Sequence, residues 1–258
     1  MTRRPRPARM AELVADTLRR QIFEGIHVEG LPKEEELRER FGVAKSSMRE
    51  ALLILETEGL ITVRRGNVGG SSVHLPTIES AAYSIGLSMS AGAATLGDVA
   101  EALQVLEPMC ASLCARLENR GEKLVPELDR LNTAYENEIE DGLEAIKLSR
   151  KFHEAVVEGC GNAAFSIVTS ALARVWSAHE VDWATEATLS GTFPDLETRK
   201  DALKWHVEVA ALIRAGDPKV SDAVATHLRE AQAHTLTNRA GQRVDVAQLR
   251  RRVQTGDF

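Results

Sequence analysis

Long apolar segments are absent from this sequence, and cysteines are few. No apolar run approaches the roughly 20 residues that a membrane-spanning helix needs. The basic residues near the start of the chain are followed by no apolar stretch, so we expect no secretory signal, no membrane contact and a cytoplasmic protein. Cys110, Cys114 and Cys160 are too few and too odd in number for a disulfide framework. We expect buried free thiols, with a redox or metal role as the alternative.

Motifs of enzyme active sites are missing too. The sequence contains no Gly-x-Ser-x-Gly elbow, no P-loop and no Rossmann fingerprint. The segment "FHEAVVEG" begins like a zincin helix at His153, but it lacks the second histidine of that motif. Because no nucleophile lies at a readable spacing from a base, we expect that the protein is not an enzyme.

The charge is distributed unevenly along the 258 residues, which are enough for two domains. The net charge is −6, yet residues 1–75 carry 13 lysines and arginines against 11 acidic residues. The other residues carry 19 basic against 27 acidic side chains. An acidic protein can still bind DNA if its basic groups gather on one surface.

The N-terminal part has the pattern of a winged helix-turn-helix. Apolar residues at helical spacing predict helices over 9–25, 33–42 and 45–58, each ended by a glycine. The β-branched segments "LITVRR" and "SSVHL" flank the turn residues "GNVGG" and predict a β-hairpin. Three short helices followed by a hairpin are typical of this DNA-binding fold.

The third of these helices has two faces. Met48, Leu52 and Leu55 recur at helical spacing and form an apolar stripe. Lys45, Ser46 and Arg49 fall on another face near the helix N-terminus, where a recognition helix presents side chains to the major groove. Arginine and lysine bind guanine O6 and N7, and serine can bind a phosphate or a base edge. Two further arginines, Arg64 and Arg65, fall at the base of the predicted wing.

The rest of the chain predicts a mainly α protein. Apolar periodicity favours helices near 78–90, 96–119, 123–140, 143–159, 163–189, 196–215 and 219–238. We therefore expect three parts: a winged helix-turn-helix domain over 1–76, an all-α antiparallel helical bundle over 77–240, and a basic C-terminal tail over 241–258.

The segment "LPKEEELRERFGVAKSSMREALLILETEGLITVRRGNVGG" resembles the DNA-binding domain of the GntR family. "VLEPMCASLCARL", "FHEAVVEGCGN" and "WHVEVAALIRAGD" resemble the C-terminal domain of the FadR subgroup, the FCD domain. The resemblance implies a transcriptional regulator that binds a short palindromic operator in double-stranded DNA as a homodimer, and we expect a repressor. Residues implied to contact DNA are Lys45, Ser46, Ser47, Arg49 and the wing near Gly66.

The sequence departs from this family at two positions of the DNA-binding domain. Glu35 occupies a position where several relatives carry an arginine that contacts DNA. Ala44 replaces the serine or threonine that usually opens the recognition helix, and losing a hydroxyl cap costs about 1 kcal/mol.

Histidines in three predicted helices are the candidate sensor site. Histidine is the commonest metal ligand, and the FCD resemblance implies a divalent metal, zinc or nickel, bound by His153, His206 and His227. The family's aspartate ligand is replaced by Ser149, so we expect weaker metal binding; an organic ligand alone is the alternative.

The resemblance also places a small-molecule effector beside these three histidines. Leu103 replaces the arginine that binds an effector carboxylate in many relatives, which disfavours a small hydroxy- or keto-acid and favours a more apolar effector such as a fatty-acyl derivative; a carboxylate effector stays open. A DNA-binding regulator or scaffold that senses nothing, with structural histidines, is the alternative function.

Overall fold

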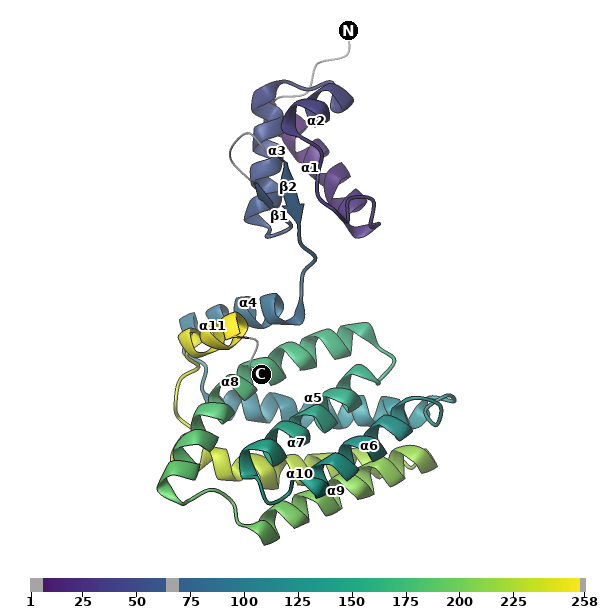
Figure 1. Ribbon diagram of the computed structural model, residues 1–258, viewed down its shortest axis with the longest axis vertical. Coiled ribbons are helices and arrows are strands. Elements are labelled where there is room, and N and C mark those ends of the chain that lie inside the picture. Colours follow the sequence, from purple (N-terminus) through teal and green to yellow (C-terminus); the bar gives the residue numbers. More distant parts are fainter. Residues whose placement is uncertain (1–6, 64–69, 256–258) are drawn as a thin grey trace. The chain divides into compact units, whose positions relative to one another are not determined.

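The computed structural model describes residues 7–63 and 70–255 (Figure 1). The chain forms two compact units, the head, Met1–Thr77, and the body, Ile78–Phe258. The prediction of a mainly helical protein with one small hairpin is confirmed. Arg64, Arg65 and Gly66, predicted at the wing, lie outside the described residues.

The head contains three helices and one two-stranded sheet. Its elements are α1 (Pro7–Phe23), α2 (Glu34–Phe41), α3 (Lys45–Thr57), β1 (Ile61–Val63) and β2 (Ser71–Val73). The strands are antiparallel, with Ile61 opposite Val73. Gly42 ends α2 with φ 63°, a left-handed conformation in which its N–H bonds back to α2. The head has its own core, in which α3 packs against α1.

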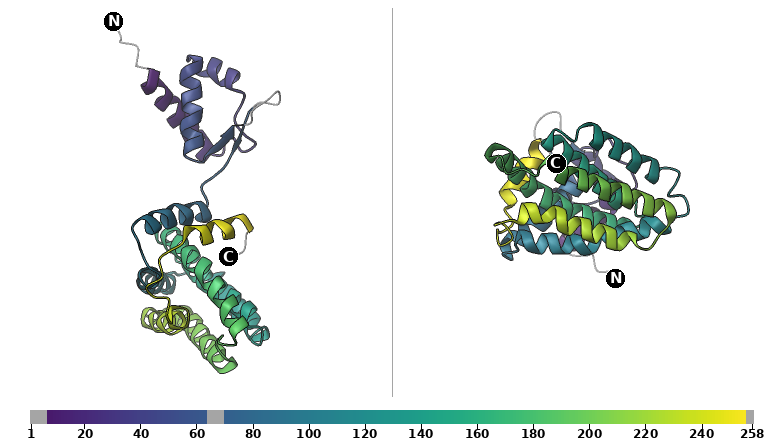
Figure 2. Two further views of the ribbon diagram at one scale, coloured as in Figure 1. Left: turned by 90° about the vertical axis from the view of Figure 1, so that its left-hand side faces the viewer. Right: turned by 90° about the horizontal axis from the view of Figure 1, so that it is seen from below.

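The body is built from helices around α5. They are α4 (Ile78–Ala91), α5 (Leu96–Arg116), α6 (Leu124–Asn137), α7 (Gly142–Glu158), α8 (Ala163–Ser190), α9 (Leu196–Ala215), α10 (Val220–Leu236) and α11 (Val246–Thr255). Helix α5 packs against α7, α8, α9 and α10, so residues far apart in sequence meet around it (Figure 2). Cys110, Cys114 and Cys160 are free and buried there, as predicted. Among the described residues, no helix is long and apolar enough to cross a membrane.

The C-terminal segment packs against the bundle, although the sequence analysis set it apart as a tail. Helix α11 lies along α4 in both figures, and Leu249 is buried against α4 and α8 (Figure 1, Figure 2). A methyl group on Gly86 of α4 would lie 2.9 Å from the Leu249 Cδ2 atom, so a larger residue at this position would make the leucine side chain shift. The preceding segment is tied to the start of α5, because the Leu96 N–H donates to the Gln242 carbonyl at 2.8 Å.

Candidate functional site

Helix α3 buries its apolar stripe in the head. Met48, Leu52 and Leu55 are all buried, as their spacing predicts. The helix starts after Ala44, which provides no side-chain hydrogen bond to the first turn. Helix α3 is therefore held by packing against α1 and α2 and not by a hydroxyl cap.

An exposed face of α3 carries the predicted DNA-contacting residues. Lys45, Ser46 and Arg49 are all exposed. Ser47 is only 4% exposed, because it falls on the buried side beside Met48. The structure thus presents three of these α3 residues to solvent and assigns Ser47 to packing.

Acidic side chains of α2 lie next to this surface. Glu34, Glu35 and Glu36 form the first turn of α2, where carboxylates are stabilised by the helix dipole. Glu35, at the family's arginine position, pairs with Arg38 of the same helix at 3.3 Å. Glu34 instead contacts α3 through Arg49. The sequence analysis did not identify that pair, because the two residues are 15 positions apart.

Inside the body, the three predicted histidines converge. His153 comes from α7, His206 from α9 and His227 from α10. The Nε2 atom of His227 lies 3.2 Å from His153 Nε2 and 3.1 Å from His206 Nε2. His206 is 0% exposed and His227 is also buried, so the nitrogens meet away from solvent.

A buried carboxylate on α5 orients one of these histidines. Glu107 Oε2 lies 2.9 Å from His153 Nδ1, so we assign the Nδ1 proton to a hydrogen bond donated to Glu107. Burial acts to lower the pKa of His153, but the Glu107 carboxylate and its hydrogen bond outweigh burial and raise that pKa. The sequence analysis missed Glu107. Its signal was a glutamate in the apolar segment "VLEPMCASLCARL", where an acidic residue needs a partner.

The imidazole side chains of His206 and His227 are neutral, so each has a ring nitrogen with a free lone pair. Burial and then the neighbouring histidines lower the pKa of His206. Burial, followed by the charge of His153, lowers the pKa of His227 to about 3. Both side chains are therefore uncharged near pH 7, which is the form that binds metals.

The geometry of the cluster is suited to a cation. Ligand nitrogens around a tetrahedral zinc ion at about 2.0–2.1 Å lie roughly 3.3–3.4 Å apart, slightly more than the two separations at His227 Nε2. The ligand atoms of all three histidines lie within 4.8 Å of one another. Without a cation, the single Nε2 atom of His227 faces two other imidazole nitrogens and can form a well-directed hydrogen bond with only one. Ser149 Oγ lies 3.4 Å from His206 Nε2, at the position of the family's aspartate. The donor set is thus complete except for an anionic ligand.

Aromatic rings hold the His206 side chain in place. Phe152 stacks on the His206 ring with centroids 4.3 Å apart, and Tyr135 meets its edge at 5.5 Å. The Nδ1 atom of His206 is buried and has no hydrogen-bond partner among the described residues. A metal-binding histidine is usually oriented by a hydrogen bond from its other ring nitrogen. In His206, packing against the aromatic rings takes that role.

Two cavities adjoin the histidine cluster. The first measures about 290 Å³ and has an aromatic and acidic lining that includes Tyr135, Trp183, Phe193, Trp205, His227 and Glu230. The second measures about 200 Å³ and is lined by residues that include Leu103, Glu107, Arg150, His153 and Trp176. Ser149 and Glu180 line both cavities, so the two lie on either side of the same residues. Small molecules could reach the histidines from these spaces.

A buried charge pair lies at the second cavity. Arg150 Nε lies 3.6 Å from Glu180 Oε2, which is longer than a hydrogen bond. The Nε and Nη1 groups of Arg150 are buried without a hydrogen-bond partner in the described part of the chain. Arg150 therefore offers donors to the cavity that contains Leu103, although sequence reasoning did not single it out.

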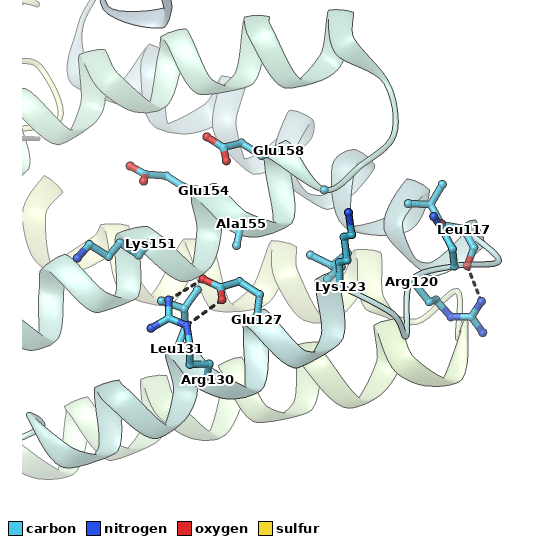
Figure 3. Close-up of a pocket in the computed structure, with 13 residues that line it drawn as sticks. Leu117, Arg120, Lys123, Glu127, Arg130, Leu131, Lys151, Glu154, Ala155 and Glu158 are labelled. Carbon is cyan, nitrogen blue, oxygen red and sulfur yellow. Dashed lines mark hydrogen bonds and ion pairs between the residues drawn. The ribbon is translucent and has the colours of Figure 1, made fainter.

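A separate groove of about 490 Å³ lies between α6 and α7 (Figure 3). Its lining carries charges of both signs, and Glu127 is paired with Arg130 at 2.6 Å. Glu154 is paired with Arg174. None of the three clustered histidines lines this groove, so it is distinct from the candidate sensor site.

Two family models match the chain. The model of the bacterial regulatory proteins of the gntR family matches residues 10–68, and the FCD domain model matches residues 98–231, more than half of the chain. The first match covers α2 and α3, and the second covers all three clustered histidines. Both domains are those of transcriptional regulators and not of enzymes.

Individual proteins agree with these matches. The HTH-type transcriptional repressor NanR of Klebsiella aerogenes is 26% identical over 230 residues, 87% of this chain and 85% of NanR. The Glc operon transcriptional activator of Escherichia coli is 29% identical over 158 residues, 59% of this chain and 61% of that protein. Streptococcus agalactiae GntR superposes with a TM-score of 0.62 at 23% identity, over 86% of this chain and 98% of its own. The superposition shows a shared fold.

Proposed function

Because the chain belongs to the GntR family of transcriptional regulators and carries an FCD domain, we propose that it is a cytoplasmic, ligand-responsive repressor. It binds a short palindromic operator as a homodimer, and a small molecule bound in the body changes its operator affinity. The observation that carries this proposal is the convergence of three histidine Nε2 atoms between two cavities. Repression is proposed by analogy with NanR.

The head supplies the DNA contacts. Lys45, Ser46 and Arg49 lie on the exposed face of α3, where a recognition helix meets base edges. In this proposal the wing residues Arg64, Arg65 and Gly66 add contacts to the DNA backbone. One recognition helix reads only a few base pairs, so two copies related by two-fold symmetry would give the specificity that a palindrome requires.

Exposed apolar side chains of the body support the homodimer. Met109 on α5 and Val168 on α8 are both exposed. Their chain neighbours, Cys110 and Thr169, are in contact across the two helices, with Sγ and Oγ1 3.7 Å apart. Exposed apolar side chains on two helices that pack together favour contact with another protein surface. Light scattering should give the mass of a dimer at micromolar concentration.

The cavities favour a small carboxylate over a long acyl chain. Volumes of about 200 and 290 Å³ are at or below the lower end for drug-sized ligands, roughly 300 Å³. Leu103 offers no charge to an effector, but Arg150 lines the same cavity, and its buried Nε and Nη1 groups have no hydrogen-bond partner among the described residues. In this proposal Arg150 binds the carboxylate by charge-assisted hydrogen bonds, which is the role of the family's arginine.

His153, His206 and His227 would hold a divalent metal, zinc or nickel. A bound metal supplies positive charge that attracts an effector carboxylate. Glu107 fixes the His153 ring so that its Nε2 lone pair faces the cluster. Ser149 adds no negative charge, so binding would be weaker than with the family's aspartate. No catalytic role is assigned to these residues.

The effector acts through the difference in its affinity for two states of the protein. A coupling free energy of about 1–3 kcal/mol would change operator affinity by a factor of roughly 5–150. The effector would bind in the body and alter how the two heads of the dimer engage the half-sites.

The test compares wild type with the double variant His153→Ala, His206→Ala. Mass spectrometry of the denatured protein first identifies any small molecule that co-purifies. Trp183 and Trp205 line the first cavity and Trp176 lines the second, so intrinsic fluorescence reports binding of that molecule. Wild type should bind it and change operator affinity, whereas the double variant should do neither. The control is His234→Ala, which changes an exposed histidine of the first cavity outside the cluster.

A different outcome supports the alternative function. If the folded double variant binds the molecule and responds like wild type, the histidines are structural. If wild type shows no response either, the protein is a DNA-binding regulator or scaffold without sensing. Circular dichroism of each variant establishes that it is folded.

A further inference from the structure

We propose that Glu34 is a positioning residue that holds the Arg49 guanidinium in the orientation that reads a guanine. This inference rests on the proposed DNA-binding function of the head. It starts from a contact between the first turn of α2 and the exposed face of α3. The Nε atom of Arg49 lies 3.2 Å from Glu34 Oε1 and 3.4 Å from Oε2, so its N–H donates between both carboxylate oxygens.

This contact engages only one edge of the guanidinium. The two terminal amino groups, Nη1 and Nη2, form no hydrogen bond with any described residue. Arg49 remains 64% exposed while Glu34 is about half as exposed, at 34%. The carboxylate thus takes up the Nε–H group, and the fork of terminal N–H groups on the more exposed arginine stays available to a ligand.

That remaining fork matches guanine in particular. Guanine presents two acceptors, O6 and N7, to the major groove, whereas adenine presents one acceptor and one donor. With Nε occupied, Arg49 can offer only the N–H donors of Nη1 and Nη2. At adenine, one of these donors would face the donor N–H of the amino group, which is unfavourable. An arginine without such a partner can also turn toward a phosphate, which carries no sequence information. Glu34 therefore favours base reading over backbone binding.

Both partners are held by the core of the head. Leu37 of α2 is fully buried, and so is Met48 of α3, the residue before Arg49. The Cα positions of Glu34 and Arg49 are therefore set by two packed helices. Fixing the guanidinium before DNA arrives lowers the side-chain entropy lost on binding.

The neighbouring Glu35 provides a matched control. It belongs to the same acidic turn, but its ion-pair partner is Arg38 of its own helix, at 3.3 Å. Glu34→Ala and Glu35→Ala each remove one carboxylate from the first turn of α2. Both changes weaken the repulsion of phosphates, so each should increase the affinity for all DNA by a similar factor. Only Glu34→Ala removes a contact with the recognition helix.

The experiment uses full-length protein and randomised duplex DNA. The wild type is first used to select a preferred sequence. Affinities for that duplex and for every single-base change in one half-site are then measured by fluorescence anisotropy. For Glu35→Ala, all affinities should shift by one common factor. For Glu34→Ala, discrimination at one guanine position should fall by about fivefold or more, since a bidentate arginine–guanine pair accounts for that much selectivity.

A double variant tests whether the effect passes through Arg49. In an Arg49→Ala background, Glu34→Ala should change all affinities by one factor and cause no further loss of discrimination. If Glu34→Ala alone shifts all affinities in parallel, as Glu35→Ala does, the positioning role is overturned while the DNA-binding function stands. If wild type selects no sequence, both are overturned. Circular dichroism excludes variants that do not fold.

Discussion

The head and the body place their functional side chains in opposite environments. Arg49 of the head is 64% exposed, whereas His206 of the body is 0% exposed. A DNA-reading residue has to keep its charge and reach a large polyanion, so exposure suits it. A ligand-binding imidazole has to stay neutral and dry, and burial lowers the pKa of His206 accordingly. The same protein thus uses solvent in one unit and excludes it in the other.

Thiol reactivity should show the largest difference between these environments. Burial raises the pKa of Cys110 and of Cys114 to about 12, which leaves almost no reactive thiolate at pH 8. A new thiol on the exposed face of α3, in Ser46→Cys, should react with a thiol reagent at least about a hundredfold faster than these native cysteines. The rate of colour release from Ellman's reagent measures this. Because the thiolate is the reactive form, raising the pH should accelerate the reaction of the native thiols. Unfolding in urea should expose all three native cysteines to the reagent. Fast reaction of Cys110 or Cys114 in folded protein would contradict the buried site.

Removing the exposed cation should have the next largest effect. Arg49→Ala should weaken operator binding by about 1–3 kcal/mol and relax the base preference at one position per half-site. Deleting residues 1–8, which contain Arg3, Arg4 and Arg6, should weaken binding to all sequences alike and make it less dependent on salt. Titrations with operator and mutated duplexes at several salt concentrations separate the base-specific contribution of Arg49 from the sequence-independent contribution of residues 1–8. If the deletion abolished specificity while Arg49→Ala bound normally, the two roles would be reversed.

Adding a charge to the buried cluster should have a smaller effect of opposite sign. Ser149→Asp restores the family's carboxylate at a position whose Oγ now lies 3.4 Å from His206 Nε2, and we expect zinc to bind about tenfold more tightly. Calorimetric titration of metal-free protein with zinc measures the change. Ser149→Asn is the uncharged control and should leave the affinity near that of wild type. Equal affinities for all three proteins would show that position 149 does not face the metal.

The smallest expected effect is on the stability of the head. Ala44→Ser supplies the missing cap of α3 and should stabilise the head by about 1 kcal/mol. All three tryptophans lie in the body, so fluorescence follows the unfolding of that unit. Circular dichroism follows the helices of both units. The substitution should raise the unfolding midpoint of the head, which appears in the dichroism signal but not in the fluorescence signal. An unchanged midpoint for the head would show that the serine does not cap α3.

Local sequence patterns predicted most of the fold. The hairpin and α3 follow from turn residues and apolar spacing, and these depend on residues close together in the chain. Spacing could also have excluded Ser47 from the exposed face, since it lies one helical turn from the fully buried Ala51. The packing of α11 was missed because its partner, α4, is more than 150 residues earlier in the chain.

The candidate site was predictable only in part. The three histidines were identified through a family resemblance, and the structure brings their Nε2 atoms together. Glu107 and Arg150 were not identified, because their roles depend on which helix faces the cluster. Contacts across a bundle are set by tertiary packing, and no local periodicity encodes them.

The position of Leu249 in the body has a consequence for the order of folding during synthesis. The core of the head draws on residues up to Val73 and can close early. The part of the body core around α4 and α8 includes Val244 and Leu249, so it is complete only after Leu249 has been synthesised. At roughly 5–20 residues per second, the interval is about 10–35 s. For that time each nascent chain carries a finished head and an unfinished body.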